Sequence, residues 1–238
     1  MPATPPLPPP TLPVHDMRKQ RSDGAEARAH LLLSALRLFA EKGFAKTSTR
    51  EIAQAAGANV AAISYYFGDK AGLYRSVFTE PLGVPCDDIS RYLPAHLSLR
   101  EAMEGFIAGF LEPLKQGDMA QQITRLHFRE MLEPTGLWAE QINNNIKPAH
   151  AALAEVLARH LGVTKIDDDV HRLAFSIAAL AMQMFISRDV IENVRPQLIA
   201  TSKAIDLWAS RLADFAEAMI AVEAARRRQP VTDKKKTS

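Results

Sequence analysis

Apolar residues recur every three or four positions along most of the chain, the spacing that places them on one face of an α-helix. A clear example lies between residues 29 and 39, where the apolar positions include Ala29, Leu32, Leu33, Leu36 and Phe39. Segments in which apolar and polar residues alternate, as they do in half-buried strands, are few. The pattern therefore predicts an all-α protein.

The breaks in this pattern divide the chain into a series of predicted helices. A glycine or a proline follows several of the apolar stretches, and a residue of a type that caps helices precedes several of them. The predicted ranges are about 24–42, 48–57, 59–66, 69 to Pro81 or Pro85, 98–113, 118–132, 136–161 with a kink near Pro148, 170–187 and 203–227.

Capping residues support these boundaries. Ser48 and Glu51 are three residues apart, the spacing of a capping box in which each side chain accepts a hydrogen bond from the other residue's backbone. The same spacing recurs at Ser98 and Glu101. Gly43 is suited to end the first helix as a C-cap. Further helix starts are marked by Asn59, Asp69, Asp118 and the acids at 167–169.

The two ends of the chain differ from the middle in composition. Seven of the 15 prolines lie within residues 1–13, where they prevent a helix and favour an extended chain. We expect a disordered arm over 1–22 and, from its polar and charged composition, a disordered basic tail over 228–238. Between them we expect a first helical domain over 23–84 and a larger one over 85–227.

Charge is distributed unevenly, although the net charge is only +2. Residues 17–80 contain ten Lys and Arg against six Asp and Glu, whereas residues 81–225 contain 13 against 19. A basic N-terminal part joined to an acidic body suits an anionic partner at one end only. Chance segregation of surface charge explains the same distribution, so charge alone does not decide the partner.

Cysteine content and hydropathy narrow the class of protein. Cys86 is the single cysteine, which excludes an intramolecular disulfide framework and a thiol-based zinc site. Its neighbours Asp87 and Asp88 disfavour the thiolate that a redox sensor needs. The longest apolar run, 173–186, has 14 residues and is too short to span a membrane. No export signal is recognisable, so we expect a cytoplasmic protein without a membrane partner.

Residues 48–67 carry the most informative pattern, two short helices joined at Gly57. In a helix-turn-helix of this kind the second helix enters the major groove of DNA and the first crosses the phosphate backbone. Helical hairpins with a glycine in the turn are common, so the pattern alone leaves DNA binding open. The residues expected to face inward are Ile52, Ala53 and Ala56 in the first helix and Ile63 and Phe67 in the second.

The run from Leu31 to Phe78 resembles the DNA-binding domain of TetR-family transcriptional regulators. The matching motifs are LFAEKGF, TSTREIA, AGAN, YYFGDK and the LY that follows. In the C-terminal part, HFREM, Pro134-Thr135 and the long helices resemble the CecR-type subgroup. The resemblance implies a three-helix helix-turn-helix domain that continues through a fourth helix into a larger helical domain for ligand binding and dimerisation.

The resemblance, together with side-chain chemistry, assigns the DNA contacts. A short hydroxyl such as that of Thr49 suits a phosphate oxygen, and Arg50 can form two hydrogen bonds with guanine. Small residues on the recognition helix permit contact with a thymine methyl group. The expected DNA-binding residues are Thr49, Arg50, Val60, Ala61, Ser64, Tyr65, Tyr66 and Lys70.

Three points about these residues stay open at the level of sequence. Thr49 and Arg50 are also consistent with a simple helix start and a solvated charge. One of the two tyrosines, Tyr65 or Tyr66, can instead pack against the first helix. Ser64 departs from the aromatic residue that relatives often have here, and we expect this to alter base preference without abolishing binding.

The C-terminal domain contains methionine and aromatic residues that suit either a packed core or a cavity for a small effector. The resemblance implies the cavity, with His127 and Arg125 or Arg129 as the polar groups that orient a ligand. We also expect a homodimer formed through residues 168–187 and 203–227, because the helix over 170–187 is apolar on nearly every face. A helix buried inside a monomer has the same pattern. The candidate effector residues are Arg125, His127, Met131, Trp138, Met182 and Phe185.

We find no pattern for metal binding, catalysis or a cofactor. His127 has no second His or Cys three or four residues away, as a zinc-binding helix has. His150, His160 and His171 are too widely spaced in the sequence to suggest a site. Phosphate-binding glycine loops and the G-x-S-x-G motif are missing. We therefore expect neither a metal site nor an enzyme.

Together these patterns predict a sequence-specific DNA-binding regulator, a repressor that a small molecule releases from an inverted-repeat operator. The alternative is a helical small-molecule-binding protein or enzyme in which the helix-turn-helix is incidental. The regulator is favoured by a cluster of residues beside a basic first helix, namely Thr49, Arg50, Tyr65, Tyr66 and Lys70. An activator and a repressor bind DNA in the same way, so the sequence does not separate them.

Overall fold

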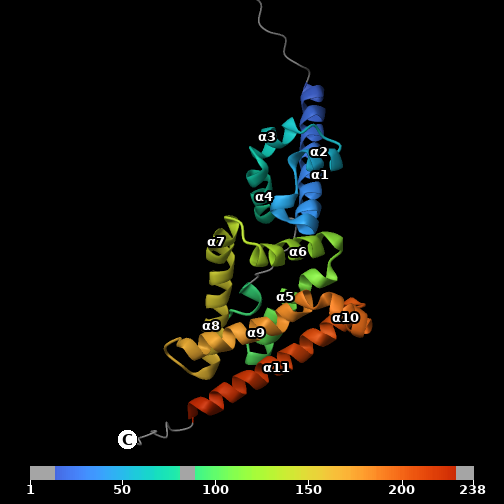
Figure 1. Cartoon of the computed structure of the whole chain (residues 1–238). Coiled ribbons are helices and arrows are strands. Elements are labelled where there is room, and N and C mark those ends of the chain that lie inside the picture. The colour runs from blue at the N-terminus through green and yellow to red at the C-terminus, as the bar shows by residue number, and fades with distance from the viewer. Residues whose placement is uncertain (1–13, 81–88, 229–238) are drawn as a thin grey trace, which may run out of the picture. The chain divides into compact units, whose positions relative to one another are not determined.

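A computed structural model describes residues 14–80 and 89–228, and its ordered elements there are all helical (Figure 1). The segments 1–13, 81–88 and 229–238 lie outside the described residues, and with them the proline-rich arm, the expected helix end near Pro81 or Pro85, Cys86 with its acidic neighbours, and most of the basic tail. The α-helices are α1 (Val14–Lys46), α2 (Thr49–Ala55), α3 (Ala61–Phe67), α4 (Lys70–Thr79), α5 (Leu99–Lys115), α6 (Asp118–Leu132), α7 (Leu137–Gln141), α8 (Lys147–Leu161), α9 (Asp168–Ile186), α10 (Arg188–Val194) and α11 (Ser202–Arg228).

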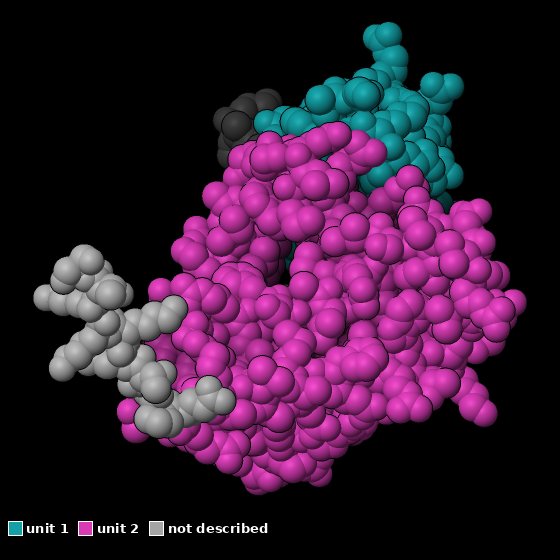
Figure 2. All heavy atoms as spheres, turned by 60° about the horizontal axis from the view of Figure 1, so that its bottom comes forward, with its two compact units in different colours: residues 1–80 teal, residues 81–238 magenta. Residues whose placement is uncertain are grey.

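The chain forms two compact units, residues 1–80 and 81–238 (Figure 2). The first unit contains α1 to α4, and the second contains all the later helices. The predicted all-α class is confirmed by this structure.

The first unit has a core in which α1 contributes the longest apolar face. Ring contacts join α1 to α4, since Phe39 meets Tyr74 edge to face with ring centroids 4.8 Å apart. Such an aromatic pair adds about 0.5–1.5 kcal/mol to the burial of its area. Short α2 and α3 close the core through residues that are almost fully buried, namely Ile52, Ala53, Ile63 and Phe67.

The first helix is longer than predicted. Its backbone is helical from Val14, so the expected disordered arm over 1–22 is wrong for 14–22. The prolines end at Pro13, immediately before the helix, where the missing N–H of a proline costs nothing. Gly43 interrupts the helix as predicted, with φ 79° and ψ 168°, a conformation that a residue with a Cβ rarely adopts.

The second unit is a bundle in which α11 lies along α5 and also packs against α9 (Figure 1). Among the described helices, α9 alone is long and apolar enough to cross a membrane. Its inner face belongs to the core of the unit instead, and six of its side chains are buried there: Val170, Leu173, Ala174, Ile177, Ala181 and Met184.

The predicted kink near Pro148 takes the form of a wider helical turn. Residues Ile142–Ile146 form a π-helical turn between α7 and α8, and the backbone N–H of Lys147 donates to the carbonyl of Ile142. Pro148 has no N–H and its ring crowds the carbonyl four residues earlier, so a regular α-helical ladder is broken here.

Three other boundaries differ from the prediction. The fifth helix continues through Pro113 to Lys115, because only the last turn loses a hydrogen bond to the proline. The segment after α9 forms a separate short helix, α10, followed by a 3₁₀ turn at Pro196–Leu198, which the sequence pattern did not indicate. The last helix includes Arg228, so the predicted tail over 228–238 begins one residue too early.

Candidate nucleic-acid interface

The start of α2 is fixed by a side-chain cap. The Ser48 hydroxyl accepts a hydrogen bond from the backbone N–H of Glu51 at 3.1 Å, which is one of the two bonds of the predicted capping box. The Glu51 carboxylate also accepts a hydrogen bond from Lys42 of α1, and this contact lowers the pKa of Glu51. The pair ties the beginning of α2 to α1, and with it the backbone that carries Thr49 and Arg50.

The turn between α2 and α3 depends on Gly57 and Asn59. Gly57 has φ 64°, in the left-handed region that favours glycine. The Asn59 side-chain oxygen accepts a hydrogen bond from the backbone N–H of Ala61 at 2.9 Å. Val60 occupies the backbone N-cap position, so Asn59 acts one residue earlier than a regular cap. The turn therefore sets the direction in which α3 leaves α2.

The recognition helix α3 has two distinct faces. Ile63 and Phe67 are buried against the rest of the unit, whereas Ala61, Ser64 and Tyr65 are exposed. Val60 precedes them and is also exposed. Positions 60, 61, 64 and 65 have the spacing of one helical face. The fold therefore presents four of the predicted contact residues on a single solvent-facing surface.

The two predicted contacts on α2 lie at its first turn. Arg50 is exposed and Thr49 is half-buried. On the other side of the helix, Ile52 and Ala53 are buried in the core. The N-terminal turn of α2 thus offers a guanidinium group and a hydroxyl beside free backbone N–H groups, which suits a phosphate oxygen.

Tyr65 and Tyr66 have different environments, which answers the question that the sequence left open. Tyr65 is 81 % exposed, while Tyr66 is half-buried. A Cβ added to Gly24 of α1 would lie only 3.2 Å from the Tyr66 hydroxyl oxygen, so Tyr66 packs against α1 where that helix has no side chain. Their rings meet nearly edge to face, with centroids 4.8 Å apart. Tyr65 is the tyrosine that remains available for an outside partner.

Lys70 begins α4, which Asp69 caps by accepting a hydrogen bond from the Gly72 N–H at 2.7 Å. The Lys70 ammonium lies 4.3 Å from the centroid of the Phe44 ring, and partial burial lowers the pKa of Lys70. This cation–π contact holds the positive charge of Lys70 at the N-terminal end of α4.

An ion pair that the sequence analysis missed links α1 to the residue that follows α4. Arg28 of α1 donates to both carboxylate oxygens of Glu80, with Nη1 to Oε2 at 2.8 Å. The Arg28 guanidinium also lies 4.8 Å from the centroid of the Phe67 ring on α3. The pair lowers the pKa of Glu80 and raises that of Arg28. No local sequence signal links two residues 52 positions apart.

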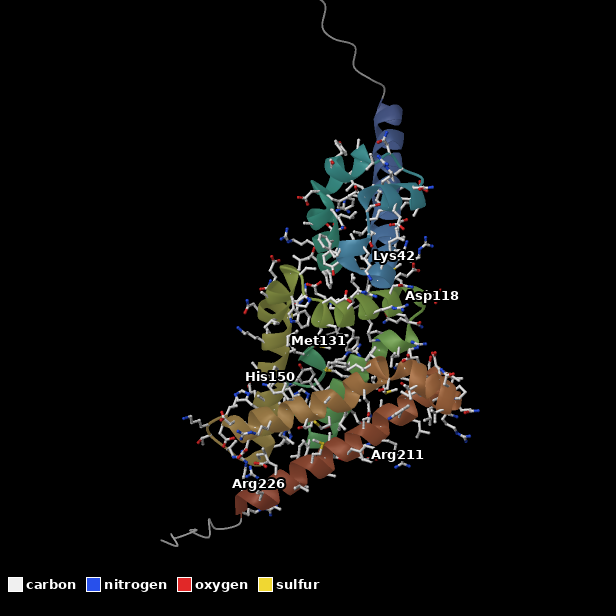
Figure 3. All side chains as sticks on the ribbon, in the orientation of Figure 1. Lys42, Asp118, Met131, His150, Arg211 and Arg226 are labelled. Atoms are coloured by element: carbon white, nitrogen blue, oxygen red, sulfur yellow. The ribbon has the colours of Figure 1, made fainter. Side chains whose placement is uncertain are left out.

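The predicted effector residues lie on three helices of the second unit. Arg125, His127 and Met131 lie on α6 and Trp138 on α7, while Met182 and Phe185 lie on α9. Met131 is labelled in Figure 3. A ring contact joins α6 and α9, since Phe128 and Phe185 have centroids 5.7 Å apart. Arg125 is exposed, and the other five are half-buried.

Polar groups are buried on α6 near these residues. The Nδ1–H of His127 donates to the carbonyl oxygen of Ile123 at 2.9 Å, and burial lowers the pKa of His127. Glu130, fully buried, accepts hydrogen bonds from the backbone N–H and the hydroxyl of Thr135, both at 2.7 Å. The side-chain oxygen of Gln122 is buried and has no hydrogen-bond partner among the described residues. Sequence analysis missed Glu130, whose neighbours in HFREM gave no sign of its burial.

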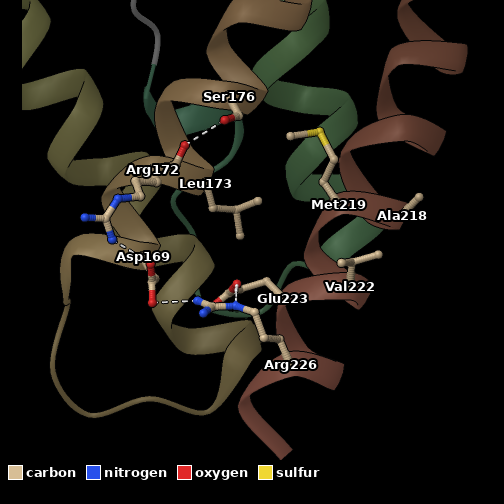
Figure 4. Close-up of a pocket in the computed structure, with 9 residues that line it drawn as sticks. All are labelled: Asp169, Arg172, Leu173, Ser176, Ala218, Met219, Val222, Glu223 and Arg226. Carbon is tan, nitrogen blue, oxygen red and sulfur yellow. Dashed lines mark hydrogen bonds and ion pairs between the residues drawn. The ribbon is translucent and has the colours of Figure 1, made fainter. Parts of the chain in front are cut away.

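A groove of about 530 Å³ lies elsewhere, between α9 and α11 (Figure 4). Its charged residues form ion pairs with one another, such as Arg226 with Asp169 at 2.5 Å and with Glu223 at 2.9 Å. None of the six predicted effector residues lines this groove. The full lining is Asp169, Arg172, Leu173, Ser176, Ala218, Met219, Val222, Glu223 and Arg226.

Comparison with known proteins assigns both units. Residues 31–77 match the model of the tetR family of bacterial regulatory proteins. Residues 99–222 match that of the C-terminal domain of the HTH-type transcriptional dual regulator CecR.

Individual relatives agree with this assignment. CecR of Shigella flexneri is 31 % identical over 150 residues, which cover 58 % of this chain and 66 % of CecR, just under two thirds of its length. The HTH-type transcriptional repressor BepR of Brucella suis is 27 % identical over 164 residues, 66 % of this chain and 74 % of BepR. The solved structure of HlyIIR, a hemolysin II transcriptional regulator, has a TM-score of 0.55 at 22 % identity, covers 74 % of this chain and 97 % of HlyIIR, and shows the shared fold.

The exposed face of α3, the capped start of α2 and the helical second unit are thus the parts of one known architecture. The chain belongs to the TetR family of bacterial transcriptional regulators, with a C-terminal domain of the CecR type.

Proposed function

We propose that this protein is a ligand-responsive repressor that binds an inverted-repeat operator as a homodimer in the cytoplasm. The observation that carries the proposal is the division of α3 into a buried face with Ile63 and Phe67 and an exposed face with Ala61, Ser64 and Tyr65. A helix anchored on one side and free on the other can enter the major groove as a rigid probe.

The contact residues have separate roles in this proposal. Thr49 and Lys70 bind phosphate oxygens and fix the register of the protein on DNA. Arg50 reads guanine O6 and N7, and Val60 with Ala61 contacts a thymine methyl group. Ser64 and Tyr65 add hydrogen bonds from the exposed face of α3. Tyr66 supports α3 from behind, since it packs against α1 at Gly24.

The effector site is proposed at the contact of α6 with α9, where aromatic rings of both helices meet and α6 also carries buried polar groups. The rings of Phe110 and Phe128 both lie within 6 Å of the Phe185 ring. The side-chain oxygen of Gln122 is buried and has no partner among the described residues, so a ligand donor can satisfy it. Burial lowers the pKa of His127, and the Nε2 atom of the neutral ring, whose Nδ1–H donates to Ile123, can accept a hydrogen bond. An apolar ligand with one or two hydrogen-bonding groups fits this arrangement.

A homodimer through α9 and α11 is supported by apolar side chains that the monomer leaves exposed. Along α11, Leu207, Phe215 and Val222 are spaced by eight and seven residues and lie on one stripe. On α9, Phe175 and Ile186 are exposed as well. Exposed apolar patches of this kind mark protein interfaces. In a two-fold dimer the same patch of each subunit packs against its copy on the other subunit.

Repression by release follows from a two-state equilibrium in the proposed mechanism. An effector that binds one arrangement of the second unit more tightly shifts the population toward it, by no more than its difference in affinity for the two states. The favoured arrangement places the paired α3 helices out of register with the operator. Relatives support repression only in general terms, since BepR is named a repressor and CecR a dual regulator.

The experiment selects genomic DNA fragments on the purified protein, then screens small molecules for release of the strongest fragment. We expect one or a few fragments that contain an inverted repeat, and release by a compound of the class described above. His127→Gln should bind the operator as tightly as the wild type yet need more effector for release. Selection of no fragment over random DNA contradicts the function, and an unchanged effector response in His127→Gln contradicts the effector site alone.

A further inference from the structure

Two histidines that are distant in the sequence meet on the second unit. The Nε2 atom of His150, on α8 (Figure 3), lies 2.9 Å from the Nδ1 atom of His171 on α9. Their rings are nearly parallel, at 15° with centroids 5.2 Å apart. Phe175, one turn further along α9, stacks on the His150 ring with centroids 4.2 Å apart. The two imidazoles are therefore held in place from two helices.

Each ring of the pair turns one nitrogen toward the other ring, so the two nitrogens are close enough to bind the same ion. A neutral imidazole nitrogen is the commonest protein ligand of transition-metal ions. Both rings are only half-buried, so an ion reaches them from solvent.

The distance between the facing nitrogens indicates which geometry suits the pair. Two imidazole nitrogens, each about 2.05 Å from a metal ion, are about 2.9 Å apart when the angle at the ion is close to 90°. That angle is found between neighbouring ligands of square-planar and octahedral ions, whereas a tetrahedral ion separates them further. The observed 2.9 Å thus fits the first group better than a structural zinc site.

We propose that His150 and His171 form a two-histidine site for a divalent transition-metal ion of square-planar or octahedral preference, such as Cu²⁺ or Ni²⁺. The ion binds both facing nitrogens from beside the line that joins them, and the hydrogen that they now share moves to the outer nitrogen of its ring. Among the described residues no group of three or more His, Cys, Asp or Glu side chains gathers, so water completes the coordination. The bound ion links α8 to α9, independently of the proposed function.

The test uses untagged, metal-free full-length protein titrated with CuCl₂ or NiCl₂. Calorimetry should show one site per chain that loses at least tenfold in affinity in His150→Gln and in His171→Gln. His160→Gln is the matched control, because His160 also lies on α8 but bonds through Nδ1 to the Val156 carbonyl. It should keep the wild-type affinity.

A second measurement does not depend on any variant. The electron paramagnetic resonance spectrum of the wild-type protein with one equivalent of Cu²⁺ should show two equatorial nitrogen ligands. A spectrum without equatorial nitrogen overturns the proposal, as does equal affinity in the wild type and both pair variants. In either case the two histidines form a hydrogen-bonded contact between α8 and α9 and nothing more.

Discussion

On α2, α3 and α4, some residues are placed to contact DNA and others support those residues. Tyr65 and Tyr66 are adjacent, yet one is 81 % exposed and the other packs against α1. Lys70 combines both roles, because its ammonium lies over the Phe44 ring and carries a positive charge at the N-terminal end of α4. Environment, rather than residue type, therefore separates the contact residues from their supports.

Arg50→Ala and Lys70→Ala should both weaken operator binding, for different reasons. Lys70 contributes through phosphate charge, so its loss should weaken binding to all sequences alike and lower the salt slope by about one. Arg50 reads a base in the proposal, so its loss should cost about 1–3 kcal/mol and relax preference at one position. Fluorescence anisotropy at several salt concentrations measures both effects.

Lys165→Ala is the control for these two variants, since Lys165 is an exposed lysine of the second unit. It should leave the affinity and the salt slope unchanged. Undiminished affinity in both Arg50→Ala and Lys70→Ala would remove this segment from the DNA interface.

The buried His127 should make stability depend on pH. Its pKa in the folded protein lies below the ordinary 6.5, so the unfolded chain takes up a proton first as the pH falls through that value. Burial lowers the pKa of His150 in the same direction. The free energy of unfolding should therefore fall between about pH 6.5 and pH 5, before carboxylates titrate.

His127→Gln removes one of these titrating groups. At neutral pH the free energy of unfolding should be about 1 kcal/mol lower than in the wild type, because the hydrogen bond from His127 to the Ile123 carbonyl is lost. The stability of the variant should then fall less steeply as the pH is lowered. Urea unfolding at several pH values measures the slope, with exposed His96→Gln as the control. Parallel slopes in His127→Gln and the wild type would show that His127 does not titrate on unfolding.

At the residue scale, the role of a residue could be predicted from the sequence where that role depends on a local pattern. The exposed face of α3 follows from helical spacing and could be predicted from residues 60–65. The Arg28–Glu80 and His150–His171 pairs could not, because they join positions 52 and 21 residues apart. Only the packing of helices brings such residues together.

At the scale of elements, boundaries set by neighbouring residues could be predicted, and those set by packing could not. The Ser98–Glu101 capping box is fully formed, and α6 begins at Asp118 and ends at Leu132 as expected. By contrast, α10 has no side-chain cap and no buried residue, so its sequence shows neither a capping residue nor an apolar face that would predict a helix.

The Arg28–Glu80 pair should couple the helices of the first unit to one another. Glu80→Gln removes the charge that Arg28 faces beside Phe67, and we expect a loss of about 0.5–1 kcal/mol because both side chains are partly exposed. Operator affinity should fall as well, since α3 loses support at Phe67. Thermal unfolding and anisotropy titrations measure the two effects.

Glu133→Gln is the matched control, because it removes a carboxylate from the exposed Arg129–Glu133 pair on the second unit. Its stability should remain within about 0.5 kcal/mol of the wild type. An equal change in Glu80→Gln and Glu133→Gln would mean that the Arg28 contact does not hold α3.

At the scale of the whole molecule, the proposed dimer accounts for the apolar stripe on α11. Phe215→Glu places a charge in that stripe on an exposed position, so the fold should survive while the dimer dissociates. Sedimentation velocity at micromolar concentration should give a dimer for the wild type and a monomer for the variant. Leu132→Glu, on exposed Leu132 of α6, should remain dimeric. A monomeric wild type, with no dimer formed on DNA, would contradict the interface.

The central claim is that the exposed face of α3 reads operator DNA in a two-fold arrangement. A hydroxyl-radical footprint of the wild-type protein on its selected genomic fragment tests this most directly. We expect two protected half-sites related by inverted repetition, with centres about 10 base pairs or a multiple apart unless the second unit widens the spacing. Tyr65→Ala combined with Arg50→Ala should abolish the protection while the protein remains folded. Uniform protection without half-sites, or a footprint that this double variant leaves unchanged, would contradict the claim.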